Sequence, residues 1–268
     1  MQATDAAFSG SIPALYDSKL GPLLFEPYAQ DIARRAADLR PRRILETAAG
    51  TGIVTSAVAR ELPKAGIVAT DLNQAMLDIA AARPDLRRVM FRQTDAQALP
   101  FPNDEFDLVV CQFGVMFFPD RIGACREALR VLAPGGTFLF NVWDSLDRNP
   151  VSAIAAKAVA ALFPDDPPSF LQRVPFGYHD ERRIEEDLRA AGFGTVTIHR
   201  VAKESRIASP RDAASGLCLG SPLRAEIEAR AAERLDEAAA AAEAAMVAAG
   251  YGPGAVSPLS ALVVAARA

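Results

Sequence analysis

Residues 42–54 read RRILETAAGTGIV, and this stretch decides the fold that we expect. A short apolar run ends in the acid Glu46, passes through small residues and two glycines, and leads directly into a helical pattern. This order is typical of a nucleotide-binding turn, because the free N–H groups at the start of a helix attract anions. Gly50 and Gly52 allow a ligand to approach the backbone closely and allow a positive φ. We therefore interpret the stretch as a cofactor loop, although the loop alone does not identify its ligand.

Apolar runs and amphipathic helical patterns alternate from this loop to residue 142. The run 106–113 is almost continuously apolar, as expected for a strand that is buried on both faces of a parallel sheet. The alternation predicts the α/β class, with a doubly wound, Rossmann-like sheet and right-handed crossovers. We expect the strands of this sheet at residues 43–46, 66–71, 89–92, 106–113 and 137–142.

The alternation ends beyond Trp143, where the sequence predicts additions to the sheet. Residues 164–177 are rich in proline and predict a loop, and one long helix rich in Ala, Glu and Arg is expected from Ser221 to Gly250. The other expected elements are helices at 150–163 and 180–191 and strands at 195–201 and 261–265.

Charge and composition exclude several classes of partner. The 268 residues include 29 Lys and Arg and 33 Asp and Glu, which gives a formal net charge of −4 and no general attraction to nucleic acid phosphates. No stretch approaches the ~18 to 20 uninterrupted apolar residues of a membrane span, and the amino terminus lacks a secretory pattern. We therefore expect a cytoplasmic protein with neither a nucleic acid nor a membrane partner. The three cysteines have neither Cys-x-x-Cys spacing nor nearby histidines, so we expect no disulfide framework and no metal site.

Candidate binding residues follow the expected strands. In an open α/β sheet, ligands lie outside the carboxyl ends of the strands, where the strand order reverses. Asp71 follows Gly52 at close to the ~20-residue spacing of a carboxylate that accepts ribose hydroxyls, which favours an adenosine-type ligand. Asp95 follows the third strand, where a carboxylate can accept the exocyclic amine of adenine. A helix-capping role for Asp71 and an ordinary loop role for Asp95 remain as alternatives.

Four stretches, in this order and spacing, resemble the signatures of the class I S-adenosylmethionine-dependent methyltransferases, in particular small-molecule enzymes with a type 11/25-like domain. They are 46–52 (ETAAGTG), 70–77 (TDLNQAML), 95–101 (DAQALPF) and 130–136 (RVLAPGG). The resemblance implies a seven-stranded, mostly parallel sheet whose last strand is antiparallel and lies beside the sixth. It also implies an N-terminal helical arm or lid at 1–40 and a methyltransferase domain at 41–268, with helical cap additions at about 144–180 and 205–255.

The resemblance further implies S-adenosyl-L-methionine as the cofactor and assigns residues to its parts. The methionine and ribose portion would be held by Glu46, Ala48, Gly50 and Gly52, the ribose by Asp71, and the adenine by Leu72, Asp95 and Ala96. Gln112 would lie near the sulfonium, and Tyr16 of the arm would cover the cofactor. The family usually has glycine at the position of Ala48, and we expect alanine to fit there if its φ stays negative.

The resemblance implies methyl transfer to a small-molecule acceptor. Because such a transfer is an in-line displacement from a good leaving group, alignment can supply much of the acceleration and no enzyme nucleophile is required. His179 is the candidate base for an acceptor that must lose a proton, with a helix-start role as the alternative. Other functions left open are a non-catalytic protein that binds an adenosyl cofactor and an NAD(P)-dependent oxidoreductase, whose Gly-x-Gly-x-x-Gly pattern is incomplete here. The sequence does not decide between a monomer and a homodimer.

Overall fold

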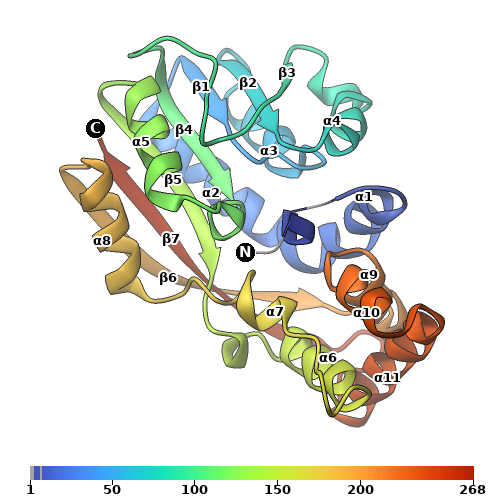
Figure 1. Ribbon diagram of the computed structural model, residues 1–268. Helices are drawn as coiled ribbons and strands as arrows, with labels where there is room; N and C mark the ends of the chain where they lie inside the picture. Colours follow the sequence, from blue (N-terminus) through green and yellow to red (C-terminus); the bar gives the residue numbers. More distant parts are fainter. Residues whose placement is uncertain (1–2, 7) are drawn as a thin grey trace. The chain divides into compact units, whose positions relative to one another are not determined.

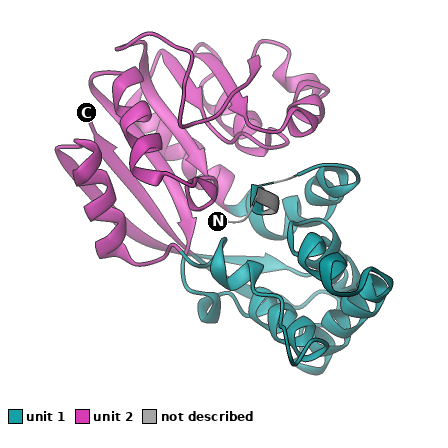
Figure 2. Cartoon of the chain, in the orientation of Figure 1, with its two compact units in different colours: residues 1–27, 144–177, 202–260 teal, residues 28–143, 178–201, 261–268 magenta. Residues whose placement is uncertain are grey.

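The computed structural model of the protein describes residues 3–6 and 8–268. The chain forms two compact units, which Figure 2 shows in different colours. The helical unit comprises Met1–Pro27, Asp144–Gly177 and Ala202–Ser260, and the sheet unit comprises Tyr28–Trp143, Tyr178–Val201 and Ala261–Ala268.

One seven-stranded sheet runs in the order β3-β2-β1-β4-β5-β7-β6. The first five strands pair in parallel, and β7 is antiparallel to β5 and lies between β5 and β6 (Figure 1). This arrangement confirms the predicted fold class. The strand order reverses at β1, which pairs with both β2 and β4, so a ligand is expected at the carboxyl ends of these strands. The strands are β1 Arg43–Glu46, β2 Gly66–Asp71, β3 Met90–Gln93, β4 Phe106–Gln112, β5 Leu132–Trp143, β6 Thr195–Arg206 and β7 Val256–Arg267.

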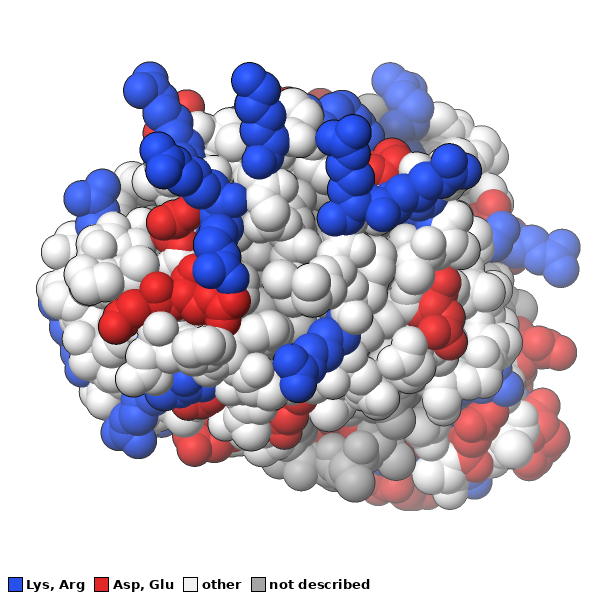
Figure 3. Space-filling view, turned by 90° about the horizontal axis from the view of Figure 1, so that it is seen from above, with Lys and Arg blue, Asp and Glu red and all other residues white. Residues whose placement is uncertain are grey.

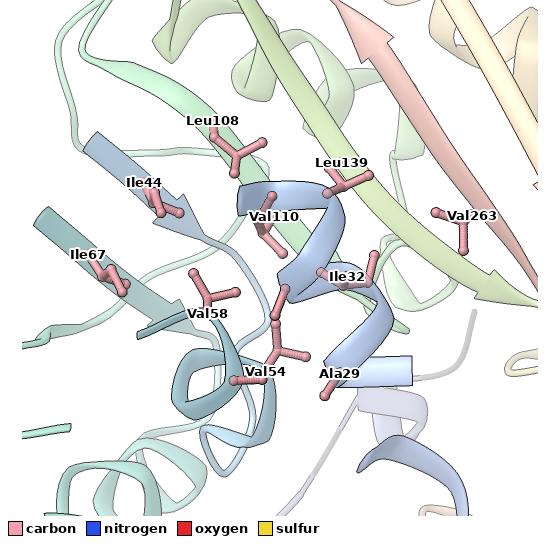
Figure 4. Packing of buried hydrophobic residues seen from close by; sticks show 13 residues of the cluster. Ala29, Ile32, Ile44, Val54, Val58, Ile67, Leu108, Val110, Leu139 and Val263 are labelled. Atoms are coloured by element: carbon pink, nitrogen blue, oxygen red, sulfur yellow. The ribbon is translucent and has the colours of Figure 1, made fainter. Parts of the chain in front are cut away.

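The core of the sheet unit lies between the strands and two helices, α2 (Glu26–Leu39) and α3 (Ile53–Glu61). Ile32 of α2, Val58 of α3 and Val110 of β4 belong to one cluster of buried apolar side chains, drawn in Figure 4. Burial of each such side chain contributes roughly 1.5–3 kcal/mol, so this cluster holds the strand order and with it the position of the loop after β1. The other helices of this unit are α4 Gln74–Ala81, α5 Arg121–Val131 and α8 Glu181–Ala191, with short 3₁₀ turns at Pro84–Leu86 and Val115–Phe117.

The helical unit has its own charge network, in which two buried carboxylates pair with a partly exposed arginine. Arg173 donates to Asp5 at 2.6 and 2.8 Å and to Glu226 at 2.8 Å, and Glu226 also accepts from the backbone N–H groups of Ser169 and Phe170. These bonds fasten the N-terminal 3₁₀ turn to two helices of this unit. Its elements are the 3₁₀ turns Ala3–Ala6, Leu146–Arg148 and Ala232–Arg234, the π-helical segment Tyr16–Phe25, and the helices α1 Ile12–Leu15, α6 Pro150–Ala161, α7 Phe170–Arg173, α9 Pro210–Leu219, α10 Leu223–Ala231 and α11 Leu235–Ala248.

The long helix expected between Ser221 and Gly250 is two helices, and the prediction of one helix is wrong. Ala231 adopts an extended backbone, and a 3₁₀ turn separates α10 from α11. In that turn Arg234 donates to the carbonyl of Leu162 and stacks over the ring of Phe163, 5.1 Å from its centroid. Helix propensity alone contains no sign of the break, since it arises from these tertiary contacts.

Other boundaries also differ from expectation. The short helix α7 lies within the expected loop 164–177, and α9 had no counterpart in the sequence analysis. Both β6 and β7 extend beyond the predicted spans of 195–201 and 261–265. Their additional residues alternate in burial or are polar, so the apolar pattern marked only part of each strand.

Among residues 3–6 and 8–268, no helix is both long and apolar enough to cross a membrane. On the face drawn in Figure 3, Lys and Arg side chains gather toward one edge of the view, with Asp and Glu side chains among and below them.

Candidate functional site

The loop between β1 and α3 is fastened to the two strands that flank β1. The backbone N–H of Thr47 donates to the carbonyl of Val110 in β4, and that of Ala49 donates to the carbonyl of Thr70 in β2, each at 2.9 Å. Because both strands are held by the sheet, the path of the loop is fixed from two sides. The loop therefore lies at the carboxyl ends of the strands, as expected.

Both loop glycines have the backbone conformation that the sequence analysis anticipated. Gly50 has a φ of 58° and Gly52 a φ of 80°, values that L-residues with a side chain rarely adopt. At Gly52 a Cβ atom would also lie 2.9 Å from both the Cβ of Ala80 and the Cδ1 of Leu86. Glycine is thus required at Gly52 for conformation and for packing.

Ala48 differs from the expectation that its φ stays negative, because its φ is +52°. A left-handed conformation costs an alanine roughly 1–2 kcal/mol. Gly114, at the start of the segment after β4, leaves space for the alanine methyl group. A Cβ atom at Gly114 would lie 2.5 Å from the Cβ of Ala48 and 2.6 Å from the Sγ of Cys111. The usual glycine is therefore replaced here by a strained alanine packed against a glycine of the neighbouring loop.

Asp71, at the end of β2, connects the loop to the next helix. Its side chain is 7% exposed, and it accepts hydrogen bonds from the N–H of Gly50 at 2.9 Å, the N–H of Asn73 at 2.8 Å and the side-chain amide of Asn73 at 3.4 Å. Burial raises the pKa of Asp71, and these donors lower it in part. A carboxylate has about four acceptor positions, so about one remains for a ligand. Asn73 does occupy the N-cap of α4, but its side chain turns to Asp71 instead of capping the helix.

Glu46, at the end of β1, is a buried carboxyl group without a full set of partners. It is 2% exposed, and its Oε2 has no hydrogen-bond partner. Burial raises the pKa of Glu46 to about 8, the Thr55 hydroxyl opposes this rise, and the charge of Asp71 adds to it. The Thr55 hydroxyl nevertheless makes no hydrogen bond of good geometry, and the hydroxyls of Thr51 and Ser56 are also buried without partners. The start of α3 therefore has hydroxyl groups that can form hydrogen bonds with a ligand.

The loop after β3 contains Asp95 and Ala96, both half-buried. The carboxylate of Asp95 accepts from the backbone N–H of Gln97 at 2.9 Å and from its side-chain amide at 3.1 Å to each oxygen. Gln97 in turn accepts from the N–H of Asp120, the N-cap of α5. Gln97 was not among the predicted residues, although an Asp in a loop commonly accepts from the backbone N–H two residues later.

Gln112, at the end of β4, is positioned by a residue that the sequence analysis also missed. Asn141 of β5 is fully buried, and its side chain donates to the Oε1 of Gln112 at 3.4 Å and accepts from the N–H of Phe113 at 3.0 Å. Phe113 has a φ of +52°, and its ring stacks on Trp143 with centroids 3.8 Å apart. A lone asparagine inside an apolar strand was the sequence feature that marked this position.

The contacts of three further candidates do not test the roles predicted for them. Leu72, next to Asp71, is 50% exposed. Tyr16 belongs to the helical unit, where its ring stacks on Phe25 at 4.6 Å. His179 is exposed and belongs to the sheet unit, just before α8, although it fell within the predicted cap addition. The roles of these residues stay predictions.

The parallel strands bring the predicted residues of β1, β2, β3 and β4 to one edge of the sheet. Contacts connect Gly50, Asp71 and the loop directly, whereas Asp95 and Gln112 each lie at the end of their own strand. Within the described part of the chain, no group of three or more His, Cys, Asp or Glu residues is placed to hold a metal ion. The three cysteines are buried and free.

Comparisons with known proteins agree with this geometry. Residues 44–136 match the protein family described as "Methyltransferase domain". A demethylmenaquinone methyltransferase from Clavibacter sepedonicus is 33% identical over 203 residues, which cover 68% of this chain and 82% of the relative. One from Thermus thermophilus is 43% identical over 109 residues, which cover 38% of this chain and 50% of that protein, and further relatives match over 42% of their length.

The chain thus spans half or less of the length of the first curated relatives that it matches. Among solved structures, the YcgJ protein from Bacillus subtilis has the same fold, with a TM-score of 0.59 and 19% identity over 90% of this chain and 97% of that one. The family match and the extended similarity to the Clavibacter enzyme together settle the family. The chain belongs to the class I S-adenosylmethionine-dependent methyltransferases.

Proposed function

We propose that this protein transfers a methyl group from S-adenosylmethionine, the cofactor of its family, to a small-molecule acceptor. The observation that carries the proposal is the pair of buried carboxyl groups, Glu46 and Asp71, at the ends of the neighbouring strands β1 and β2. Each retains acceptor capacity. A cofactor with an ammonium group and ribose hydroxyls supplies the donors that these groups lack.

The residues of this edge fit the cofactor. Asp71 has about one acceptor position left for a ribose hydroxyl, and the Oε2 of Glu46 is free to accept from an ammonium group. The exposed apolar surface of Leu72 is suited to pack on adenine. Gly50 and Gly52 keep the backbone of the loop open to close approach.

Two positions further along the edge would complete the cofactor site. Asp95 uses about three of its four acceptor positions on Gln97, so one is available for the exocyclic amine of adenine, beside Ala96. Gln112, held by Asn141, would lie near the sulfonium. We propose these roles together with that of Tyr16, which would cover the cofactor.

When bound, the sulfonium supplies an activated methyl group with a neutral thioether as the leaving group. The protein's own task is then to hold the acceptor in line, which can account for a large part of the acceleration without a covalent enzyme intermediate. His179 is the proposed base for acceptors that must lose a proton. Phe163 and Phe170, two aromatic residues of the helical unit, are buried in the core of that unit.

We further propose that the protein works in the cytoplasm on a free small molecule. The formal charge of −4 supports an acceptor other than nucleic acid. The curated relatives include enzymes named for demethylmenaquinone, and whether this chain accepts a related compound is open to direct assay.

The experiment is to incubate the protein and S-adenosylmethionine with a panel of phenols, carboxylic acids, amines and thiols and to measure S-adenosylhomocysteine. We expect product with at least one acceptor class, and product that depends on the acceptor. Cofactor binding without product from any class would favour the second candidate, a non-catalytic protein that binds an adenosyl cofactor. That candidate would have the same cofactor edge, by which we mean Glu46, Asp71, Asp95, Gln112 and the loop after β1. Methyl transfer requires no enzyme nucleophile, so no such residue distinguishes an active enzyme from a binding protein.

A further inference from the structure

Two carboxyl groups of the cofactor edge have opposite surroundings. Asp71 accepts three hydrogen bonds from N–H groups of Gly50 and Asn73, and such donors favour the ionised form. Glu46 accepts none from an N–H group, and its Oε2 has no partner at all. Of the two groups, Glu46 is therefore the one that retains a proton.

The groups that face Glu46 explain why its charge is not compensated. They are the Thr55 hydroxyl of α3, the Asp71 carboxylate of β2 and the Cys111 thiol of β4. The pKa of Cys111 is raised to about 12 by burial, so its thiol is neutral. No cation is among these neighbours, and Asp71 adds a negative charge. An isolated buried carboxylate is costly, and a group in such surroundings binds a proton instead.

We propose that Glu46 is a proton-exchange site, at which an ammonium group of the cofactor replaces the carboxyl proton. This inference rests on the proposed function, because it assigns the amino-acid part of S-adenosylmethionine to Glu46. On binding, the O–H bond of Glu46 breaks, the proton passes to solvent, and the carboxylate pairs with the ammonium group. The ammonium group keeps its three protons, and nothing is oxidised or reduced.

Two consequences follow for binding. Binding at pH 7 releases about 0.8 proton per ligand on balance, because a group with a pKa of about 8 is about nine-tenths protonated there, while about a tenth of the ligand's α-amino groups must gain a proton. The association constant also increases about tenfold from pH 6 to pH 7, and this increase levels off as the pH approaches 8. The useful window ends near pH 7.5, because an α-amino group itself loses its proton at about pH 8.

The test is titration calorimetry of the whole protein at pH 6.0, 6.5, 7.0 and 7.5, in buffers of different ionisation enthalpy. The dependence of the heat on the buffer gives the number of protons released. S-adenosylmethionine and S-adenosylhomocysteine both contain the ammonium group, so both are expected to release a proton. 5′-Methylthioadenosine lacks the amino-acid part, so its binding is expected to release none.

Three variants locate the proton. Glu46→Gln keeps the shape of the side chain without a titratable proton, and we expect its proton release to fall below 0.2 per ligand and its affinity to lose the pH dependence. Thr55→Val removes the hydroxyl that lowers the pKa, so release is expected to persist with a midpoint at higher pH. Glu61→Gln, at the exposed end of the same helix, is the matched control and is expected to behave like the unchanged protein. Circular dichroism and thermal unfolding verify that each variant is folded.

Binding of S-adenosylmethionine without proton release, or undiminished release from folded Glu46→Gln, would overturn the inference and leave the proposed function intact. Equal release with 5′-methylthioadenosine would also overturn it, since that ligand has no ammonium group. Absence of binding by any of the three ligands at millimolar concentration would instead contradict the proposed function.

Discussion

Replacement of Asp71 by alanine removes the group that connects the cofactor loop to β2. In the folded protein this carboxylate accepts from Gly50 and Asn73 and has about one acceptor position left for a ribose hydroxyl. One charge-assisted hydrogen bond contributes about 1.5–3 kcal/mol. Loss of the ligand bond alone is therefore expected to weaken binding of S-adenosylmethionine about 10- to 150-fold at 25 °C. Release of Gly50 makes the loop less ordered and favours the upper part of this range.

The assay is titration calorimetry of Asp71→Ala and of Asp78→Ala, which changes an exposed acid of α4 next to the same region. Both variants are first compared with the unchanged protein by thermal unfolding, since the backbone N–H groups of Gly50 and Asn73 lose an acceptor only in Asp71→Ala. We expect the dissociation constant of Asp78→Ala to change less than twofold. An unchanged dissociation constant in folded Asp71→Ala would refute the reasoning and place the ribose elsewhere.

The remaining predictions concern stability. The pKa of Glu46 rises from 4.5 to about 8 on folding, so the folded form binds more protons between these values and stability falls as pH rises from about 5 to 8. In the unchanged protein this fall in the free energy of unfolding amounts to about 5 kcal/mol at most, and we expect urea denaturation of Glu46→Gln to lack it. Parallel profiles of unfolding free energy against pH for the two proteins would contradict this prediction. Ala48→Gly relieves the strain of the φ of +52° and is expected to stabilise the protein by about 1 kcal/mol. Gly114→Ala places a methyl group against Ala48 and is expected to destabilise the protein by about 1–3 kcal/mol through overpacking. In the double mutant, which lacks the Ala48 methyl group, we expect Gly114→Ala to cost less. Additive effects in that double-mutant cycle would exclude the contact. Asp5→Asn weakens the bidentate ion pair with Arg173, and we expect it to lower the free energy of unfolding by about 1–3 kcal/mol in urea denaturation. An unchanged denaturation midpoint would mean that this pair is energetically neutral.

The sheet was predictable because each parallel strand carries its own pattern. The apolar run 106–113 and the acid-loop-glycine order of 42–54 depend on local sequence, and the observed β4 and β1 agree with them within one residue. Local patterns do not record tertiary contacts, which explains the missed break near Ala231. The break is held by contacts of Arg234 with a segment about seventy residues earlier in the chain.

The positions of the site residues were predictable, but their surroundings were not. Spacing placed Asp71 and Asp95 at strand ends, whereas their partners Asn73 and Gln97 became visible only in the folded chain. The backbone of Ala48 illustrates the same limit. Ala48 has a positive φ and packs against Gly114 of the loop after β4, a contact between residues that lie far apart in sequence.

The central claim is that the edge formed by Glu46, Asp71 and the loop between them holds S-adenosylmethionine. Titration calorimetry of the purified protein with this compound at pH 7.5 tests it most directly. We expect one site per chain with a dissociation constant in the micromolar range, which corresponds to about −8 kcal/mol. Neither heat nor a thermal shift at millimolar S-adenosylmethionine would contradict the account.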